Sequence, residues 1–131
     1  MTSLNLNLAM RDFLQGRKDL SIRRPESIGK GWIPLLEQLC IQLYRLGWNK
    51  EVLQIKEKCG HLCFYVRLKS QPEKSREAIR DVISYYVQKS MTVCERCGDN
   101  ASIRTGNWIK TLCDHCNCLY LADKDYFYAD L

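Results

Sequence analysis

The sequence predicts an α+β fold in which a small helix-hairpin-helix layer precedes a C-terminal treble-clef-like zinc ribbon. Apolar residues recur at helical spacing over 32–46 and 73–89, and between them lie two β-rich runs broken at Gly60. Two Cys-x-x-Cys pairs follow. The expected parts are an N-terminal segment with a basic connection (1–30), an α+β core (31–93) and a zinc-ribbon module with an acidic aromatic tail (94–131).

The N-terminal segment gives an ambiguous signal. Leu4, Leu6 and Leu8 alternate with polar residues as in a strand, yet the spacing of Leu4, Leu8 and the Phe13-Leu14 pair also approximates a helical stripe, and both interpretations remain open. Glycines and basic residues dominate 15–31, which predicts a connection with little internal packing.

The first core element is predicted to be a helix that buries one face. Pro34 suits its first turn and Gly47 suits its C-terminal cap. Cys40 lies on the apolar face, so we expect a core thiol rather than a metal ligand. The expected stripe is Leu35, Leu36, Leu39, Cys40, Leu43 and Leu46.

An antiparallel hairpin and a second helix should complete the core. The runs 52–58 and 62–68 flank Gly60, and the second run has a period-2 apolar face, as a half-buried strand requires. A polar loop with Pro72 then leads into a helix over about 73–89. Its expected buried stripe is Ile79, Val82, Ile83 and Tyr86.

Four cysteines predict one structural zinc site. Two residues within each pair let a tight turn aim both sulfurs at one metal, and two such turns close a four-thiolate shell with no open position. Disulfides or buried thiols are the alternatives, but both spacings fit zinc. His115 or Cys118 could replace the last ligand, although the paired spacing favours Cys116. The predicted ligands are Cys94, Cys97, Cys113 and Cys116.

The same module should contain a knuckle, a hairpin and a helix. Gly98 permits the backbone to turn beneath the sulfurs of the first pair. Runs 101–104 and 108–112 flank Thr105-Gly106-Asn107, which fits a short hairpin. The second cysteine pair runs into a helical pattern at 119–121. Knuckle, hairpin and ligand-bearing helix are the parts of a treble clef.

Cys59, His61 and Cys63 surround the first hairpin's turn at every second residue. Alternation could bring the three to one side and recruit a second metal. However, only three ligands are present, and Gly60 should disrupt the alternation. We expect an ordinary strand end without metal.

Charge is segregated along the chain. Residues 1–93 carry 16 Lys or Arg against nine Asp or Glu, a net +7, whereas residues 94–131 carry four against six, a net −2. Four thiolates and one Zn²⁺ would take the module to about −4. Because phosphate binding needs local positive charge, the zinc module is a poor candidate for contacting nucleic acid.

Cysteine use and hydropathy predict a cytoplasmic protein with no membrane partner. The first residues show neither a basic n-region nor an apolar h-region, and no apolar run approaches the length of a membrane span. In a reducing compartment, eight cysteines are better explained by metal ligands and buried thiols than by a disulfide framework.

Several short stretches of the chain resemble a group of short uncharacterised bacterial and phage proteins. They are Gly31-Trp32-Ile33-Pro34-Leu35, Gln54-Ile55-Lys56-Glu57-Lys58, Cys94-Glu95-Arg96-Cys97-Gly98 and Trp108-Ile109-Lys110-Thr111-Leu112-Cys113-Asp114. The group's hairpin usually reads Lys-Glu-Lys-Phe-Gly-Gly-Leu-Arg-Phe-Tyr, and this chain departs from it at Cys59, His61 and Cys63. The resemblance covers about residues 31–118, implies a phage or mobile-element context and supplies no activity.

The sequence favours a binding protein over an enzyme. It has two histidines, one of them within the second cysteine pair, and it shows no nucleophile elbow, phosphate-cradling loop or zinc-deaminase signature. We therefore expect a non-catalytic, zinc-stabilised protein that acts stoichiometrically on a protein partner, such as an accessory or inhibitor of a host-defence system. Its oligomeric state is not predicted.

Candidate partner-binding residues fall into two sets. Exposed aromatic side chains could anchor a protein partner, although the tail aromatics could equally fold back onto the protein's own core. The aromatic candidates are Trp108, Tyr126, Phe127 and Tyr128, and Arg23 and Arg24 could contact acidic groups. The alternative is a regulatory nucleic-acid-binding zinc ribbon that would place Arg17, Lys18, Arg23, Arg24, Lys56 and Lys58 on phosphates.

Overall fold

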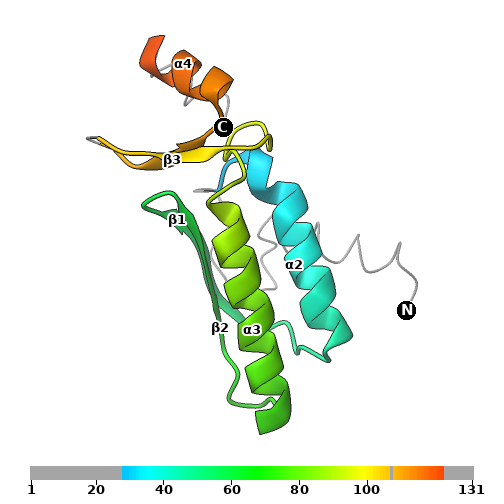
Figure 1. Ribbon diagram of the computed structural model, residues 1–131. Helices are drawn as coiled ribbons and strands as arrows, with labels where there is room; N and C mark the ends of the chain where they lie inside the picture. Colours follow the sequence, from blue (N-terminus) through cyan, green and yellow to red (C-terminus); the bar gives the residue numbers. More distant parts are fainter. Residues whose placement is uncertain (1–27, 107, 123–131) are drawn as a thin grey trace, which may run out of the picture.

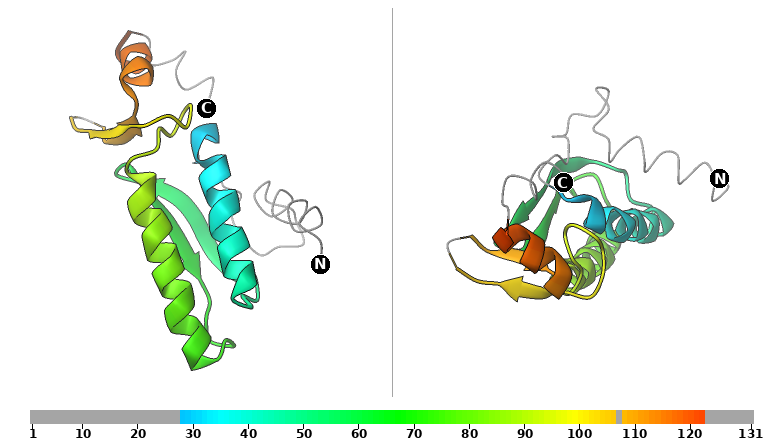
Figure 2. Two further views of the ribbon diagram at one scale, coloured as in Figure 1. Left: turned by 45° about the vertical axis from the view of Figure 1, so that its right-hand side comes forward. Right: turned by 90° about the horizontal axis from the view of Figure 1, so that it is seen from above.

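The computed structural model describes residues 28–106 and 108–122, which form a mixed α+β structure. Two helices pack against one face of an antiparallel hairpin, and a second, shorter hairpin and helix lie at one end of this layer (Figures 1 and 2). In chain order the elements are η1 (Lys30–Trp32), α2 (Ile33–Arg45), β1 (Val52–Lys58), β2 (His61–Val66), α3 (Glu73–Ser90), β3 (Ser102–Arg104), β4 (Lys110–Leu112) and α4 (Asp114–Ala122).

Helix α2 ends where the sequence predicted. Gly47 has φ +81°, and its amide donates to the carbonyl of Tyr44 at 3.0 Å, while the Trp48 amide donates to Leu43 at 3.1 Å. This pair of bonds is a Schellman motif, which glycine favours because it has no Cβ. Leu46 departs from the prediction: it lies just beyond the helix and is 37% exposed.

The β1–β2 hairpin turns on two residues, Cys59 and Gly60, with φ of +51° and +83°. Positive φ at both positions defines a type I′ turn, which matches the right-handed twist of the strands. The register pairs Ile55 with Phe64 and Glu57 with Leu62. Because side chains alternate across a strand, these pairs share the face that packs on the helices.

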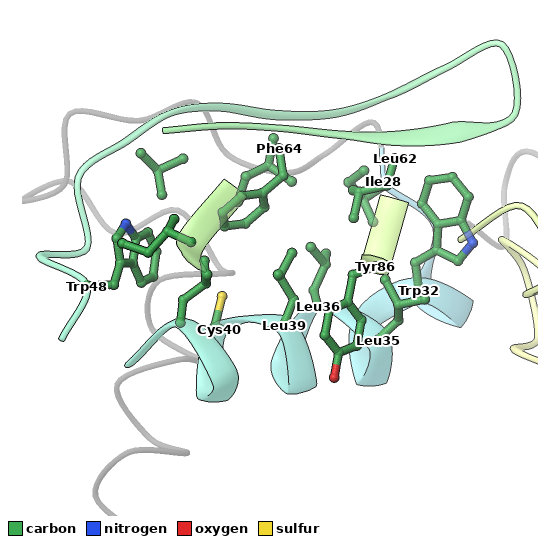
Figure 3. Packing of buried hydrophobic residues seen from close by; sticks show 14 residues of the cluster. Ile28, Trp32, Leu35, Leu36, Leu39, Cys40, Trp48, Leu62, Phe64 and Tyr86 are labelled. Atoms are coloured by element: carbon green, nitrogen blue, oxygen red, sulfur yellow. The ribbon is translucent and has the colours of Figure 1, made fainter. Parts of the chain in front are cut away.

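One apolar cluster holds the helices to the hairpin (Figure 3). Cys40 is fully buried in it, and burial, followed by the nearby Glu37 charge, raises the pKa of its thiol to about 12. Helix α3 contributes Ile79 and Tyr86, with Val82 and Ile83 only partly buried. The cluster's buried residues are Ile28, Trp32, Leu35, Leu36, Leu39, Cys40, Leu43, Trp48, Val52, Ile55, Leu62, Phe64, Ile79 and Tyr86.

The C-terminal elements form a small unit of their own. Strands β3 and β4 pair antiparallel, with Ser102 opposite Leu112 and Arg104 opposite Lys110, and α4 begins directly after Cys113. Within the described ranges, no helix has both the length and the apolar character to span a membrane.

Candidate metal centre

The first cysteine pair lies on a tight knuckle that follows α3. The amide of Cys94 donates to the carbonyl of Asp99 at 2.8 Å, and the amide of Gly98 donates to Cys94 at 2.9 Å. Gly98 has φ +87°, so the predicted glycine turn is present. The knuckle thereby aims the side chains of Cys94 and Cys97 at one point.

The second pair lies where β4 passes into α4. Cys113 is the residue between the two elements, and Cys116 follows within the helix's first turn. The Cys116 amide donates to the Cys113 sulfur at 3.3 Å, so a backbone group of the helix start holds that sulfur in place within the cluster. The helix begins at Asp114, ahead of the pattern at 119–121, and it carries Cys116, as expected of a ligand-bearing helix.

The four sulfur atoms lie within 4.8 Å of one another, and Cys97 and Cys113 are 3.6 Å apart. A tetrahedron of Zn–S bonds of about 2.3 Å needs sulfurs about 3.8 Å apart, so the donor set fits one four-coordinate metal ion. Cys94 and Cys116 are fully buried and Cys113 is 8% exposed. All four cysteines are free thiols rather than disulfides.

The alternatives raised by the sequence lie elsewhere. His115 and Cys118 are exposed on α4 and do not belong to the cluster. Cys59 is exposed, whereas Cys63 is buried. In residues 28–106 and 108–122, the group of Cys94, Cys97, Cys113 and Cys116 is the set of His, Cys and carboxylate side chains near enough to share an ion.

Local electrostatics differ between the ligands. Burial alone would raise the pKa of Cys94, but hydrogen bonds from the backbone of Cys113, Cys97 and Arg96 outweigh it and lower that pKa. At Cys116 burial prevails and raises the pKa to about 11, although the Arg96 guanidinium 3.8 Å from its sulfur opposes the shift. Arg96 therefore places positive charge beside a cluster that becomes anionic when it ligates metal.

A buried ion network ties the knuckle to the core. Lys110 lies between two carboxylates, with its Nζ 2.9 Å from Glu57 Oε1 and 3.3 Å from Glu95 Oε1. The exposed fractions of the three side chains are 7%, 10% and 3%. Burial is the largest influence on Glu95 and raises the pKa of its carboxyl despite the neighbouring Lys110. Ion pairs with so little solvent around them depend on every partner being present.

Backbone groups complete this attachment. Glu95 Oε2 accepts the amide of Thr111 at 2.7 Å, and Glu57 Oε2 accepts the amide of Gly60 at 2.7 Å. The Thr111 hydroxyl donates to the Gly60 carbonyl at the tip of the first hairpin. Glu95, which lies between Cys94 and Cys97, is thus connected through Thr111 of β4 to Gly60 in the β1–β2 turn.

Gly31 lies against the knuckle at very short range. Its amide donates to the carbonyl of Glu95 at 2.9 Å. A Cβ at this position would lie 2.2 Å from the Cys94 carbonyl oxygen and 2.6 Å from the Gly98 nitrogen. Since both are backbone atoms, neither can move aside without disturbing the metal site. The neighbouring Trp32 adds a hydrogen bond from its indole nitrogen to the Val93 carbonyl at 2.7 Å.

Of the predicted partner-binding residues, Trp108 is described. Its side chain is 42% exposed, lies 6.0 Å from the Tyr120 ring and has Lys110 Nζ 4.3 Å from its ring centre. Ile103 and Leu121 are also exposed on the same module, at 40% and 68%. The other predicted residues, Arg23, Arg24, Tyr126, Phe127 and Tyr128, lie outside the described ranges.

Sequence reasoning missed the Glu57–Lys110–Glu95 network. The three residues are far apart in sequence, and nothing in their local pattern distinguishes them from solvated charges. The one available signal was the position of Glu95 between two metal ligands, where a side chain cannot move far from the site.

No protein-family model matches the chain, and no characterised protein or solved structure is detectably similar to it.

Proposed function

We propose that the four cysteines bind one Zn²⁺ as a structural ion in a treble-clef-like zinc ribbon. Four thiolates suit zinc, and a four-sulfur tetrahedral set leaves no coordination position for water or substrate. The order of knuckle, hairpin and ligand-bearing helix supports this assignment. Bound zinc would supply cross-linking of the two cysteine pairs, and Cys94, Cys97, Cys113 and Cys116 would hold it.

On this basis the protein is a non-catalytic binding protein that acts stoichiometrically on a protein partner in the cytoplasm. The observation that carries the proposal is the combination of a closed ligand set with exposed apolar side chains on the same module. Ile103, Trp108 and Leu121 are each at least 40% exposed on a unit that has little core of its own. Tryptophan is enriched among the residues that dominate binding energy in protein interfaces.

The biological setting we propose is that of an accessory or inhibitor carried by a phage or mobile element. This part rests on the sequence resemblance described above. An inhibitor of a host-defence protein needs only to occupy a surface, which agrees with a role in binding rather than catalysis.

Purification from the native host tests the proposal. Protein that is purified with its zinc and treated with nuclease should co-purify with a defined protein at a fixed molar ratio. When equal amounts of wild type and variant are compared, Trp108→Ala should lower the amount of partner recovered per chain. Ser84→Ala, an exposed change on α3, is the matched control. Recovery of RNA or DNA alone would reject a protein partner in favour of a nucleic-acid-binding zinc ribbon.

A further inference from the structure

The β1–β2 hairpin has a second face that the apolar core does not use. Its register pairs Gln54 with Tyr65, Lys56 with Cys63 and Lys58 with His61. These pairs alternate with the core-facing pairs Ile55–Phe64 and Glu57–Leu62, so they lie on the opposite side of the sheet from α2 and α3. We call Gln54, Lys56, Lys58, His61, Cys63 and Tyr65 the outward hairpin face.

This face is basic and contains no acidic side chain. Lys56 and Lys58 lie two residues apart on one strand, which separates their Cα atoms by about 7 Å. No ion pair with another described residue involves either lysine. Glu57 lies between them in sequence but points to the other face, where Lys110 holds it. Glu57, the one acidic residue of β1, therefore lies on the opposite face of the hairpin from Lys56 and Lys58.

An aromatic side chain lies beside the two lysines. Tyr65 is 46% exposed, and Lys56 Nζ is 5.9 Å from its ring centre. Cys63 and Tyr65 are two residues apart on β2, and a hydrogen bond with Cys63, the largest influence, raises the pKa of Tyr65. Cys63 itself is only 6% exposed. The face thus presents an exposed tyrosine, a residue enriched in protein interfaces, beside two lysines whose charge would complement an acidic surface.

We infer that the outward hairpin face is a docking surface for an acidic protein surface. Lys56 and Lys58 would pair with its carboxylates, and Tyr65 would provide the apolar contact between them. The inference rests on the proposed function, because it assumes a protein partner and adds where and with what charge that partner binds.

Two features favour an acidic protein over nucleic acid. The strand is seven residues long, so the basic strip extends only about 20 Å. Beyond its turn the strip meets the described part of the zinc module (94–106 and 108–122), where three acidic and three basic residues balance. Four thiolates and one Zn²⁺ would make this part net negative, at about −2. A nucleic-acid strand would need a positive track that continues and several stacking platforms, whereas this face offers one aromatic residue. A compact acidic surface fits the strip without reaching the negative module.

The test uses full-length zinc-loaded protein and a fluorescein-labelled acidic peptide of Glu and Tyr, with oligo-U and oligo-dT of equal contour length as competitors. Fluorescence anisotropy measures binding in low salt. Lys56→Glu with Lys58→Glu should weaken peptide binding about tenfold or more, and Tyr65→Ala about threefold. Lys74→Glu with Arg80→Glu, exposed on α3, makes the same change in net charge and should have little effect. Zinc content and circular dichroism confirm that each variant folds.

Equal losses in both double variants would overturn the inference, because net charge alone would then explain binding. Absence of peptide binding, or tighter binding of either oligonucleotide than of the peptide, would also overturn it. Failure of this surface is distinguishable from failure of the proposed function. A native protein partner that co-purifies equally with wild type and the Lys56→Glu/Lys58→Glu variant would reject the surface and leave the protein-binding proposal intact, whereas recovery of RNA or DNA alone would reject the proposed function.

Discussion

Residues 28–93 bury a continuous apolar cluster, whereas the buried cluster of residues 94–122 consists of Leu112 and three of the four candidate metal ligands. Each large apolar side chain in the first region contributes about 1.5–3 kcal/mol through burial. Among the described residues, Ala101 and Tyr120 are the partly buried hydrophobic residues packed against this cluster. The two regions therefore differ in their apolar cores, and on the proposed function we expect the second to need metal ligation for its fold.

The comparison also shows how a region without its own core can be held in a fixed position. Glu95, Lys110 and Gly31 attach the knuckle to the core through buried ion pairs and backbone contacts. On the proposed function, metal ligation would fold the zinc module internally, whereas these attachments fix it against the core. The two contributions can be removed one at a time.

The largest effect should follow removal of a ligand. Cys113→Ser should abolish zinc binding, from one ion per chain to none, because three thiolates hold zinc far more weakly than four and structural ligation supplies about 10–16 kcal/mol of apparent binding free energy. Metal analysis of freshly purified reduced protein measures this directly. Cys118→Ser, on the exposed side of α4, is the matched control and should retain full zinc.

Breaking the ion network should have the next largest effect. Lys110→Met leaves the carboxylates of Glu57 and Glu95 buried without their cation, which should lower the free energy of unfolding by about 3–5 kcal/mol. Urea denaturation of the zinc-loaded protein measures the loss. Adding Glu57→Gln removes one uncompensated charge and should recover part of the stability; a double variant as unstable as Lys110→Met alone would contradict the electrostatic explanation.

Gly31→Ala tests the close contact between the regions. Its Cβ would lie 2.2 Å from a backbone oxygen of the knuckle, so the zinc module must shift, at a cost of about 1–3 kcal/mol. Thermal unfolding should show a lower midpoint, with zinc still bound. Ser84→Ala on α3 controls for the added helix propensity of alanine. An unchanged midpoint would mean that the regions are not in contact at Gly31.

The smallest effect concerns the hairpin turn and has the opposite sign. Cys59 has φ +51°, a conformation that asparagine tolerates better than cysteine. Cys59→Asn should therefore stabilise the protein by about 0.5–1 kcal/mol in urea denaturation. Zinc content should stay at one ion per chain, since Cys59 lies outside the cluster. A loss of metal would reveal a second site at the turn.

Elements with strong local signals were predictable from the sequence. The 3.6-residue period, Pro34 and Gly47 place α2, and the two residues between paired cysteines identify the four sulfurs that the fold brings together. Leu46 was predicted to be buried, but the Schellman motif at Gly47 ends the helix before that side chain reaches the core.

The features that could not be predicted from the sequence depend on contacts between segments that are far apart in the chain. Nothing local to Glu57 shows that it meets Lys110, 53 residues away, or that Gly31 must be small because Cys94 lies against it. Such contacts arise only once β4 has been placed beside the β1–β2 turn. The segregation of Lys56 and Lys58 from Glu57 likewise follows from the strand pairing rather than from their spacing in sequence.

Hydrogen exchange of the wild-type protein, before and after zinc is removed with a chelator, tests most directly whether the two regions are held together differently. The account predicts that chelation abolishes protection of the amides of β3, β4 and α4, while the amides of α2, β2 and α3 remain protected. Uniform loss of protection across both regions, or protection in the zinc module that chelation leaves unchanged, would contradict it.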